Sequence, residues 1–490
     1  MKHIISFVLF FAVTAPGLRA QSLTTAGEWP AYGRDAGGSR YSPLQQVNDG
    51  NVARLAPAWT FNTGELNTYA GTEALSKAAF EATPLMIGHT LYFSTASDRV
   101  FAIDAASGQQ QWLYDPKVNL HNDFSEITSR GVSAWPAAGE TKGTVTVKRI
   151  FIATIDGRLI CLDAATGIPV PSFGSGGSVD LKDGYGNDIS VTSPPAIIGN
   201  LIIVGSSLGD NQRVNMTRGA VRAYDVLSGA LRWTWDPIPR TAADPAWNTW
   251  QGQKAHTTGA ANAWSIISAD AINDLVFIPA TSPSPDYYGG ERIGQDLYGN
   301  CVVALRASTG SLVWYFQVVH HDLWDYDIAA QPMLISVSRD GKKIPAVAVG
   351  TKMGHIFLLD RLTGKPLWPV EERRVPASTL AGEQSWPTQP FPVLPAPLGI
   401  QRITTADAWG LTPADKEEAA QKIAMYTNEG PFTPPGSKGS LMTPGNVGGI
   451  HWGGMCFDPQ QNILITNINR LPAIIRMLPR DSAKQIQSGQ

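Results

Sequence analysis

The chain has 490 residues, which exceeds the length at which one hydrophobic core usually stops growing, so several domains or one large repeat domain are expected. Hydrophobic residues make up 43% and charged residues only 16%, while glycine, proline and tryptophan are abundant at 48, 35 and 15 residues, which favours an all-β architecture. The formal net charge of −3 provides no basic surface, so nucleic acid is not an expected partner.

The chain begins with the pattern of a secretory signal peptide. Lys2 and His3 form a short polar start, residues 4–15 are a mostly apolar run, and residues 18–20 offer a cleavage site. The run is too short to cross a bilayer comfortably, and no later segment is long enough. We therefore expect removal of residues 1–20 and a periplasmic or secreted protein with no transmembrane segment after that removal; an uncleaved anchor is the alternative.

An internal repeat dominates the chain that follows. Each copy is an apolar strand, a short polar loop and a glycine, and successive glycines lie 54 to 81 residues apart. The copies are residues 100–108, 159–167, 221–229, 302–310 and 356–364. Four copies are followed at the same offset by a tryptophan: Trp112, Trp233, Trp314 and Trp368. The glycine provides a positive-φ turn, the tryptophan buries a ring between neighbouring units, and the period predicts a β-propeller of four-stranded blades.

The last third of the chain contains a long insertion, residues 366–444. Pro413 to Tyr426 is predicted to be a helix, with Thr412 as its N-cap and Pro413 at the first helical position. The proline-rich stretch at residues 386–392 is predicted to be a loop lying over one rim.

The three cysteines, Cys161, Cys301 and Cys456, are isolated in the sequence. They form no CxxC or CxxCH motif, which argues against a structural zinc site and an attached c-type haem. Two of them could pair in an oxidising compartment, and the sequence leaves that pairing open.

Polar residues recur at two places in the repeat, before the innermost strand and after the strand that follows it. Because these two strands are antiparallel, both places should lie at one mouth of the propeller. Asp210, Asn211 and Ser284 offer oxygen ligands there for a hard divalent cation such as Ca²⁺ or Mg²⁺. A turn is the ordinary role of an Asp-Asn pair taken alone.

Four further side chains at this rim suit a planar, anionic cofactor. Trp264 could form a flat floor, Arg130 and Lys352 could hold carboxylates or a quinone oxygen, and Asp325 could take a proton from an alcohol. Three of them have an ordinary structural alternative: packing for Trp264, a solvated hairpin tip for Lys352 and a capped corner for Asp325. Their expected convergence on one rim favours a functional site.

Three motifs give the chain a family resemblance. They are residues 320–327 (HHDLWDYD), residues 350–357 (GTKMGHIF) and residues 443–449 (TPGNVGG) followed by Trp452-Gly-Gly. Together they resemble the pyrroloquinoline-quinone (PQQ) dehydrogenases, in particular the membrane-type glucose dehydrogenase branch. The resemblance implies an eight-bladed propeller with PQQ on its axis and a sugar or alcohol as substrate. A separate electron acceptor, a membrane quinone or a cytochrome, is implied because the chain has no haem motif.

The resemblance also implies roles for individual residues. Asp325 matches the family's general base, Lys352 the residue that contacts the quinone oxygens, and Trp264 the stacking floor. The other matched positions are Glu81, Arg130 and Asn467 as cofactor contacts, and Asp210, Asn211 and Ser284 as metal ligands.

The chain departs from the family pattern in three respects. Glu126 stands where sugar-oxidising relatives carry a histidine, and Asn62 replaces an arginine. About six blade-like units are visible where the family has eight, so the propeller domain, residues 21–490, is expected to be incomplete at its C-terminus. A non-catalytic propeller scaffold and an inactive quinoprotein fragment are the competing hypotheses.

Overall fold

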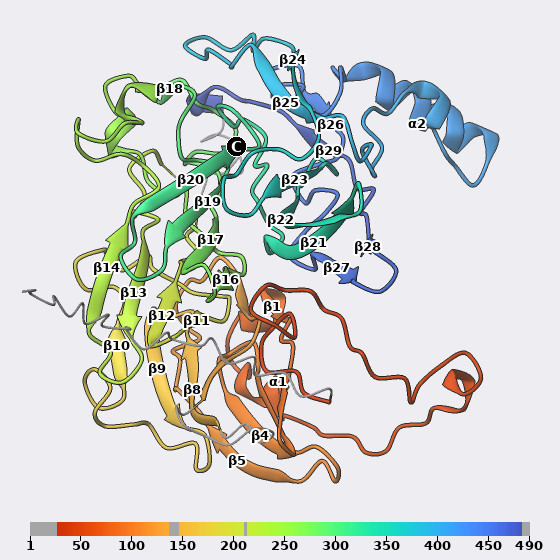
Figure 1. The fold of residues 1–490 in the computed structure, drawn as a ribbon. Helices are drawn as coiled ribbons and strands as arrows, with labels where there is room; N and C mark the ends of the chain where they lie inside the picture. Colours follow the sequence, from red (N-terminus) through yellow and green to blue (C-terminus); the bar gives the residue numbers. More distant parts are fainter. Residues whose placement is uncertain (1–26, 137–146, 210–212, 483–490) are drawn as a thin grey trace, which may run out of the picture.

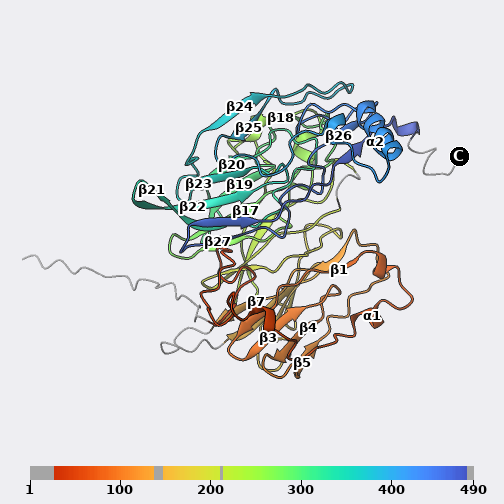
Figure 2. The same cartoon turned by 90° about the vertical axis from the view of Figure 1, so that its right-hand side faces the viewer.

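The computed structural model describes residues 27–136, 147–209 and 213–482. Its regular structure is mostly β-strand, and the sheets follow one another in chain order along an arc, from orange to blue in Figure 1. In the side view of Figure 2 the first sheet, with β3 to β5, lies below the fifth, with β21 to β23. The prediction of an all-β propeller fold is therefore confirmed, while the number of blades stays a prediction.

Four antiparallel sheets in the described residues have four strands each. The first contains β2 (Leu85–Ile87), β3 (Thr90–Ser94), β4 (Val100–Asp104) and β5 (Gln110–Tyr114). The second contains β7 (Ser133–Pro136), β8 (Val147–Ala153), β9 (Arg158–Asp163) and β10 (Ser178–Asp180). The third contains β11 (Ala196–Ile198), β12 (Leu201–Val204), β13 (Val221–Asp225) and β14 (Leu231–Trp235). The fourth contains β16 (Ser268–Asp270), β17 (Leu275–Pro279), β19 (Cys301–Arg306) and β20 (Leu312–Gln317).

The remaining sheets are smaller. The fifth contains β21 (Met333–Arg339), β22 (Lys342–Gly350) and β23 (Ile356–Asp360), and the sixth contains β27 (Met455–Asp458) and β28 (Ile463–Thr466). The described residues also form four further two-stranded pairs. These are β1 (Ala78–Phe80) with β6 (Ile127–Ser129), β15 (Trp250–Gln251) with β18 (Ile293–Gly294), β24 (Val370–Arg374) with β25 (Thr388–Pro392), and β26 (Ser440–Met442) with β29 (Ala473–Ile475). The helical elements named in the described residues are α1 (Glu65–Thr68), α2 (Pro413–Met425) and five single 3₁₀ turns.

Three of the four repeat tryptophans, Trp112, Trp233 and Trp314, join their own sheet to the next turn, as the sequence predicts. The indole nitrogen of Trp112 donates to the Ala164 carbonyl at 3.0 Å, and that of Trp233 donates to the Ala307 carbonyl at 2.7 Å. The rings lie against the repeat glycines, so a Cβ on Gly310 would stand only 2.6 Å from the Trp233 ring. Burying such a large apolar surface between sheets makes each sheet depend on its neighbour.

The N-terminal segment, residues 29–39, lies against the innermost strands. Trp29 bridges to Met86 in the first sheet, and the Ala36 carbonyl accepts a hydrogen bond from Ala269 at 2.9 Å in the fourth. Further along, the Gly37 carbonyl accepts a hydrogen bond from the Leu334 amide of the fifth sheet at 2.8 Å. The Ser39 carbonyl accepts one from the Phe457 amide of the sixth sheet at 2.9 Å. One short segment thus ties together four sheets that are far apart in the sequence.

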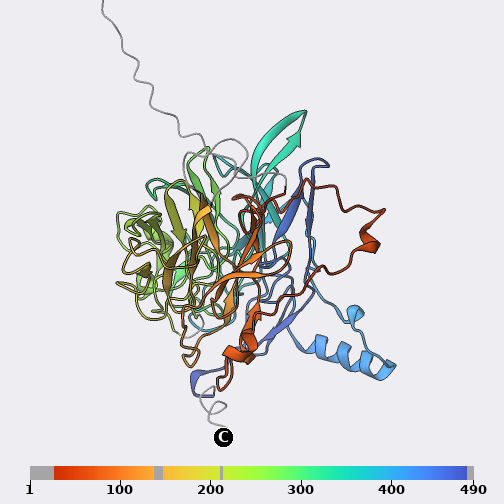
Figure 3. The ribbon, with the colours of Figure 1, turned by 90° about the horizontal axis from the view of Figure 1, so that it is seen from below.

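The long insertion confirms one prediction and corrects another. Helix α2 begins at Pro413 with Thr412 as its N-cap, in a capping box with Asp415, and it projects away from the sheets in Figures 1 and 3. The proline-rich stretch is not simply a loop, because Thr388–Pro392 pairs as β25 with β24. Its prolines are tolerated there because β25 is the edge strand of a two-stranded pair.

Two features of the sequence bear on location and redox state. The predicted signal peptide, residues 1–20, lies outside the described residues. Among the residues that the structure covers, no helix is both long and apolar enough to cross a membrane. All three cysteines are described, and none of them forms a disulfide.

Candidate functional site

Lys352 is the centre of the polar cluster at the predicted rim. It lies in the turn between β22 and β23 and is only 3% exposed. Its ammonium donates to the Asp325 backbone carbonyl at 2.7 Å and to Asp325 Oδ1 at 2.9 Å, and Asp327 Oδ2 lies 3.3 Å away. Burial opposes the charge, but the two carboxylates outweigh it and raise the pKa of Lys352 above its usual value. The side chain is therefore a buried, fully charged cation rather than a solvated hairpin tip.

Asp327 connects this lysine to the indole of Trp264. Trp264 Nε1 donates to Asp327 Oδ2 at 3.0 Å, and the other carboxylate oxygen accepts the Ser282 amide at 2.8 Å. Burial alone would raise the pKa of Asp327, but the charge of Lys352 and these hydrogen bonds lower it. An ionised carboxylate thus fixes the orientation of the Trp264 ring relative to the Lys352 ammonium.

Arg130 lies against Trp264 on the same rim. Its guanidinium carbon is 4.9 Å from the centre of the Trp264 ring and 5.4 Å from that of Trp452. It contacts Glu81 at 2.9 Å and donates to Thr192 Oγ1 at 2.6 Å. Its Nε atom is buried and has no hydrogen-bond partner among the described residues. A cation at this position can take an anionic group of a ligand.

His451 also borders this aromatic surface. Its ring centre is 5.6 Å from that of Trp264. Burial, together with the charges of Lys352 and Arg130, lowers the pKa of His451 to about 4. The imidazole is therefore neutral near pH 7 and adds no positive charge beside Trp264.

The turn that carries Asp325 is held by a second buried carboxylate. Asp325 has a positive φ of 57°, a conformation that aspartate tolerates better than most residues. On either side of it, the amides of Trp324 and Tyr326 donate to Asp322 at 2.9 and 2.8 Å. Burial and the neighbouring carboxylates, Asp325 first among them, raise the pKa of Tyr287, so that phenol stays protonated beside the turn.

The other predicted residues are placed less completely. Asp210 and Asn211 lie outside the described residues, whereas Ser284 is buried and donates its hydroxyl hydrogen to the Arg213 carbonyl at 2.8 Å. Asn467 lies near Gly453, next to Trp452: a Cβ added to that glycine would be 3.9 Å from the Asn467 side-chain oxygen. Among the described residues, no three His, Cys, Asp or Glu side chains gather as a metal-binding group.

The two departures from the family pattern differ in position. Asn62 is exposed, whereas Glu126 is partly buried. Burial raises the pKa of Glu126, an effect that nearby Arg130 opposes and Glu81 reinforces. Glu126 therefore adds a carboxylate to the rim beside the Arg130 pair.

Sequence reasoning missed Asp327 and Ser282 as site residues. Asp327 follows Asp325 by two positions in a strongly acidic stretch, so a carboxylate pair was a usable signal. Ser282 had no such signal, because it acts through its backbone amide and through a hydroxyl that donates to Asp322.

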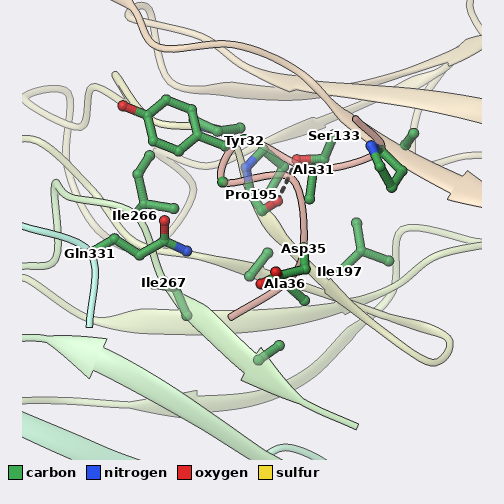
Figure 4. A pocket seen from close by; sticks show the side chains of 16 residues that line it. Ala31, Tyr32, Asp35, Ala36, Ser133, Pro195, Ile197, Ile266, Ile267 and Gln331 are labelled. Atoms are coloured by element: carbon green, nitrogen blue, oxygen red, sulfur yellow. Dashed lines mark hydrogen bonds between the residues drawn. The ribbon is translucent and has the colours of Figure 1, made fainter. Parts of the chain in front are cut away.

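A cavity of about 260 Å³ lies apart from this cluster, between the N-terminal segment and the inner strands (Figure 4). Its walls come from residues 30–36, from β7, β11 and β16, and from Gln331. The carboxylate of Asp35 is engaged by the amides of Gly37 and Ser39 at 2.9 and 3.2 Å. Neither Lys352 nor Trp264 lines this cavity.

Comparison with known proteins places the chain in a family. Residues 29–490 match the family model described as PQQ glucose/ethanol/alcohol dehydrogenase, β-propeller domain. The chain is 37% identical to the quinoprotein glucose dehydrogenase of Escherichia coli (strain K12) over 92% of its own length and 57% of that protein. It is 37% identical to the quinate/shikimate dehydrogenase (quinone) of Acinetobacter baylyi over 94% of its length and 59% of that relative.

A solved structure supports the same assignment. The quinohemoprotein alcohol dehydrogenase from Comamonas testosteroni superposes with a TM-score of 0.66 at 25% identity, over 91% of this chain and 58% of that one. The chain thus spans less than two thirds of the length of each of these relatives. Because the family model matches residues 29–490, almost the whole of this chain, the chain belongs to the PQQ-dependent glucose/alcohol dehydrogenase family.

Proposed function

We propose that the protein binds PQQ and a divalent cation at the rim around Trp264, Lys352 and Arg130, and oxidises a hydroxyl of a sugar or alcohol. The observation that carries the proposal is the continuous contact from Asp325 through Lys352 and Asp327 to the Trp264 ring. A propeller that only held other proteins would not need a buried lysine between two carboxylates beside an indole.

The residues present fit the cofactor. PQQ is planar and carries several carboxylates, so it requires an aromatic surface and nearby cations. Trp264 offers the surface, and Lys352 and Arg130 are buried cations beside it. Arg130 Nε, which is buried without a hydrogen-bond partner in the described part of the chain, offers one more donor. Glu81 and Asn467 complete the proposed set of contacts.

The side chains divide the chemistry between them. When bound, PQQ would supply an ortho-quinone able to accept a hydride, the hydrogen of the alcohol carbon with its two electrons. Asp325 is the general base, whose carboxylate takes the proton of the substrate hydroxyl. Lys352 would stabilise negative charge that develops on a cofactor oxygen, and Asp327 helps to hold its ammonium. Because these groups are fixed before substrate arrives, little reorganisation accompanies the reaction.

The metal site is proposed at Asp210, Asn211 and Ser284. Carboxylate, amide and hydroxyl oxygens suit Ca²⁺ or Mg²⁺. The Ser284 hydroxyl hydrogen is directed at the Arg213 carbonyl, which leaves its oxygen lone pairs for another partner. A cation held there would act as a Lewis acid on a bound carbonyl.

The proposal extends to the setting of the reaction. Residues 1–20 would act as a signal peptide and residues 21–490 as the propeller domain of a periplasmic or secreted protein. Electrons would pass to a separate acceptor, a membrane quinone or a cytochrome. The names of the relatives, which include glucose and quinate dehydrogenases, are the basis for proposing a sugar or alcohol substrate.

Titration of the purified chain with PQQ and Ca²⁺ tests the proposal. We expect saturable binding, seen in the quinone absorbance, and reduction of a dye when sugars or alcohols are added. Binding without turnover would favour an inactive fragment, and no binding would favour a non-catalytic scaffold.

A further inference from the structure

Behind the Asp325 turn lies a buried cluster of four ionisable side chains. His321 Nε2 is 2.7 Å from Glu383 Oε1, and His321 Nδ1 is 3.1 Å from Asp296 Oδ2. The same Asp296 oxygen is 2.7 Å from Arg292 Nη1. All four side chains are at most 2% exposed. Charged groups are buried this deeply only when they are paired.

The cluster is electrically neutral when His321 is protonated, with two cations and two carboxylates. Burial opposes the charge on His321, but Asp296 and Glu383 outweigh it and raise its pKa to about 9. The pKa of Glu383 is lowered in return, chiefly by His321 acting against burial. The imidazole therefore bridges two carboxylates as a fixed cation.

Three separate segments meet in this cluster. Arg292 and Asp296 flank β18, His321 belongs to the link from β20 to β21, and Glu383 comes from the insertion between β24 and β25. The cluster is tightly packed: if Gly289 carried a side chain, its Cβ would stand only 2.5 Å from His321 Nε2. The Gly289 amide also donates to Glu383.

Arg292 connects the cluster to the candidate site. Its Nη2 atom donates to the Asp322 carbonyl at 2.6 Å and to the Pro285 carbonyl at 3.0 Å. Asp322 holds the amides on both sides of Asp325, and Pro285 directly follows Ser284. A shift of the guanidinium would therefore move the proposed base and a proposed metal ligand together.

We propose that His321 is a positioning residue, whose charge keeps Asp296 and Arg292 in place and thereby fixes the turn that presents Asp325. This inference rests on the proposed function for its effect on catalysis. The path from His321 to the turn runs through Asp296 and Arg292 to the Asp322 carbonyl. The neighbouring His320 differs, because it contacts Glu372 at 3.1 Å and Gln317 at 2.6 Å outside the cluster.

The test compares the full chain with three variants: His321→Gln, the matched control His320→Gln, and the double variant His321→Gln/Glu383→Gln. His321→Gln removes one cation and leaves one buried carboxylate of the cluster without a compensating charge. The double variant also removes the Glu383 carboxylate, so the cluster is neutral again. PQQ affinity, kcat and KM are measured with Ca²⁺ present, together with deuterium exchange in the peptide covering residues 320–328.

We expect His321→Gln to lower kcat by about ten-fold or more while PQQ affinity changes by less than about three-fold, because small misplacements of a reacting group slow chemistry more than binding. Exchange in residues 320–328 should become faster, the double variant should recover part of kcat, and His320→Gln should stay within about two-fold of the unsubstituted chain. An unchanged kcat in His321→Gln, or equal losses in both single variants, would overturn the inference.

Failure of the proposed function can be told apart from failure of this inference. If the unsubstituted chain binds no PQQ, the exchange measurement still decides. Faster exchange at residues 320–328 in His321→Gln alone supports positioning, and unchanged exchange contradicts it. If His321→Gln does not fold, the double variant is compared with Glu383→Gln in the same way.

Discussion

Lys352 and Trp264 share one carboxylate: Asp327 Oδ2 accepts the indole N–H at 3.0 Å and lies 3.3 Å from the lysine ammonium. A single oxygen atom therefore links the indole to the buried cation, which Asp325 also holds. Because the contact joins the link before β21 to the turn after β22 and to the segment before β16, it depends on the fourth and fifth sheets together.

Substituting Asp327→Asn should remove the negative charge that pairs with Lys352 while keeping a side-chain oxygen that can accept the Trp264 indole N–H. The amide keeps the size of the side chain but loses the charge that stabilises Lys352, so we expect turnover to fall by about ten-fold to a hundred-fold. Steady-state dye reduction measures the effect. Asp340→Asn, at an exposed hairpin tip, is the control and should have no effect.

Removing the lysine should lower both catalysis and stability, because it breaks two ion pairs with little exposure to solvent. Lys352→Met keeps an unbranched side chain but removes the donor to the developing negative charge, and we expect kcat to fall by about 10²- to 10³-fold. The loss of the cation also leaves the carboxylates of Asp325 and Asp327 near each other with no positive charge between them. Lys365→Met, at an exposed turn, is the matched control; equal activity in the two variants would show that Lys352 has no catalytic role.

The tryptophan contacts between sheets should dominate stability. Trp233→Ala removes a buried ring and its hydrogen bond to Ala307, so the free energy of unfolding should fall by about 3–5 kcal/mol. Trp409, which is 74% exposed, provides the control, and Trp409→Ala should change it by less than about 0.5 kcal/mol. Urea unfolding gives both values, and similar losses would refute the role given to the repeat tryptophans.

Acid should destabilise the protein through a buried histidine. Burial lowers the pKa of His355 from 6.5 to about 4, although its hydrogen bond to Gln401 acts in the opposite direction. The unfolded chain therefore binds a proton below pH 6.5 that the folded chain binds only near pH 4. The stability contributed by neutral His355 is complete above pH 6.5 and is lost as the pH falls through 4.

This linkage predicts that the unsubstituted chain and the His355→Phe variant differ in how their free energy of unfolding depends on pH. Between pH 7 and pH 5, His355 alone should account for a loss of about 2 kcal/mol, which His355→Phe should abolish. His451 titrates in the same window and should remain responsible for part of the slope. Urea unfolding at the two pH values measures it, and an unchanged slope in His355→Phe would contradict the account.

Much of the fold could be predicted because its units repeat. Asp104 illustrates the reason: its carboxylate accepts the Ala106 and Ser107 amides at 3.1 and 2.8 Å, and Gly108 closes the turn with a φ of 72°. A local sequence pattern thus specifies a local structure, which recurs down the chain. The pairing of β24 with β25 could not be predicted this way, because it joins two segments of a non-repeating insertion.

The candidate site was predictable where residues stand at equivalent positions of the repeat, as Trp264 and Arg130 do. Asp327 and His451 were harder to assign, because their importance comes from distances across the rim rather than from spacing. The cluster around His321 was not predicted at all. Glu383 reaches it from the insertion, and no periodic pattern relates that residue to His321.

The most direct test of the central claim, that Asp325, Lys352 and Trp264 build one PQQ site, is a crystal structure of the chain with PQQ and Ca²⁺. Our account predicts the cofactor's ring system stacked on the Trp264 indole, with quinone oxygens within hydrogen-bonding reach of Lys352. Density for PQQ elsewhere, or a structure in which Trp264 and Lys352 both lie away from the bound cofactor, would contradict it.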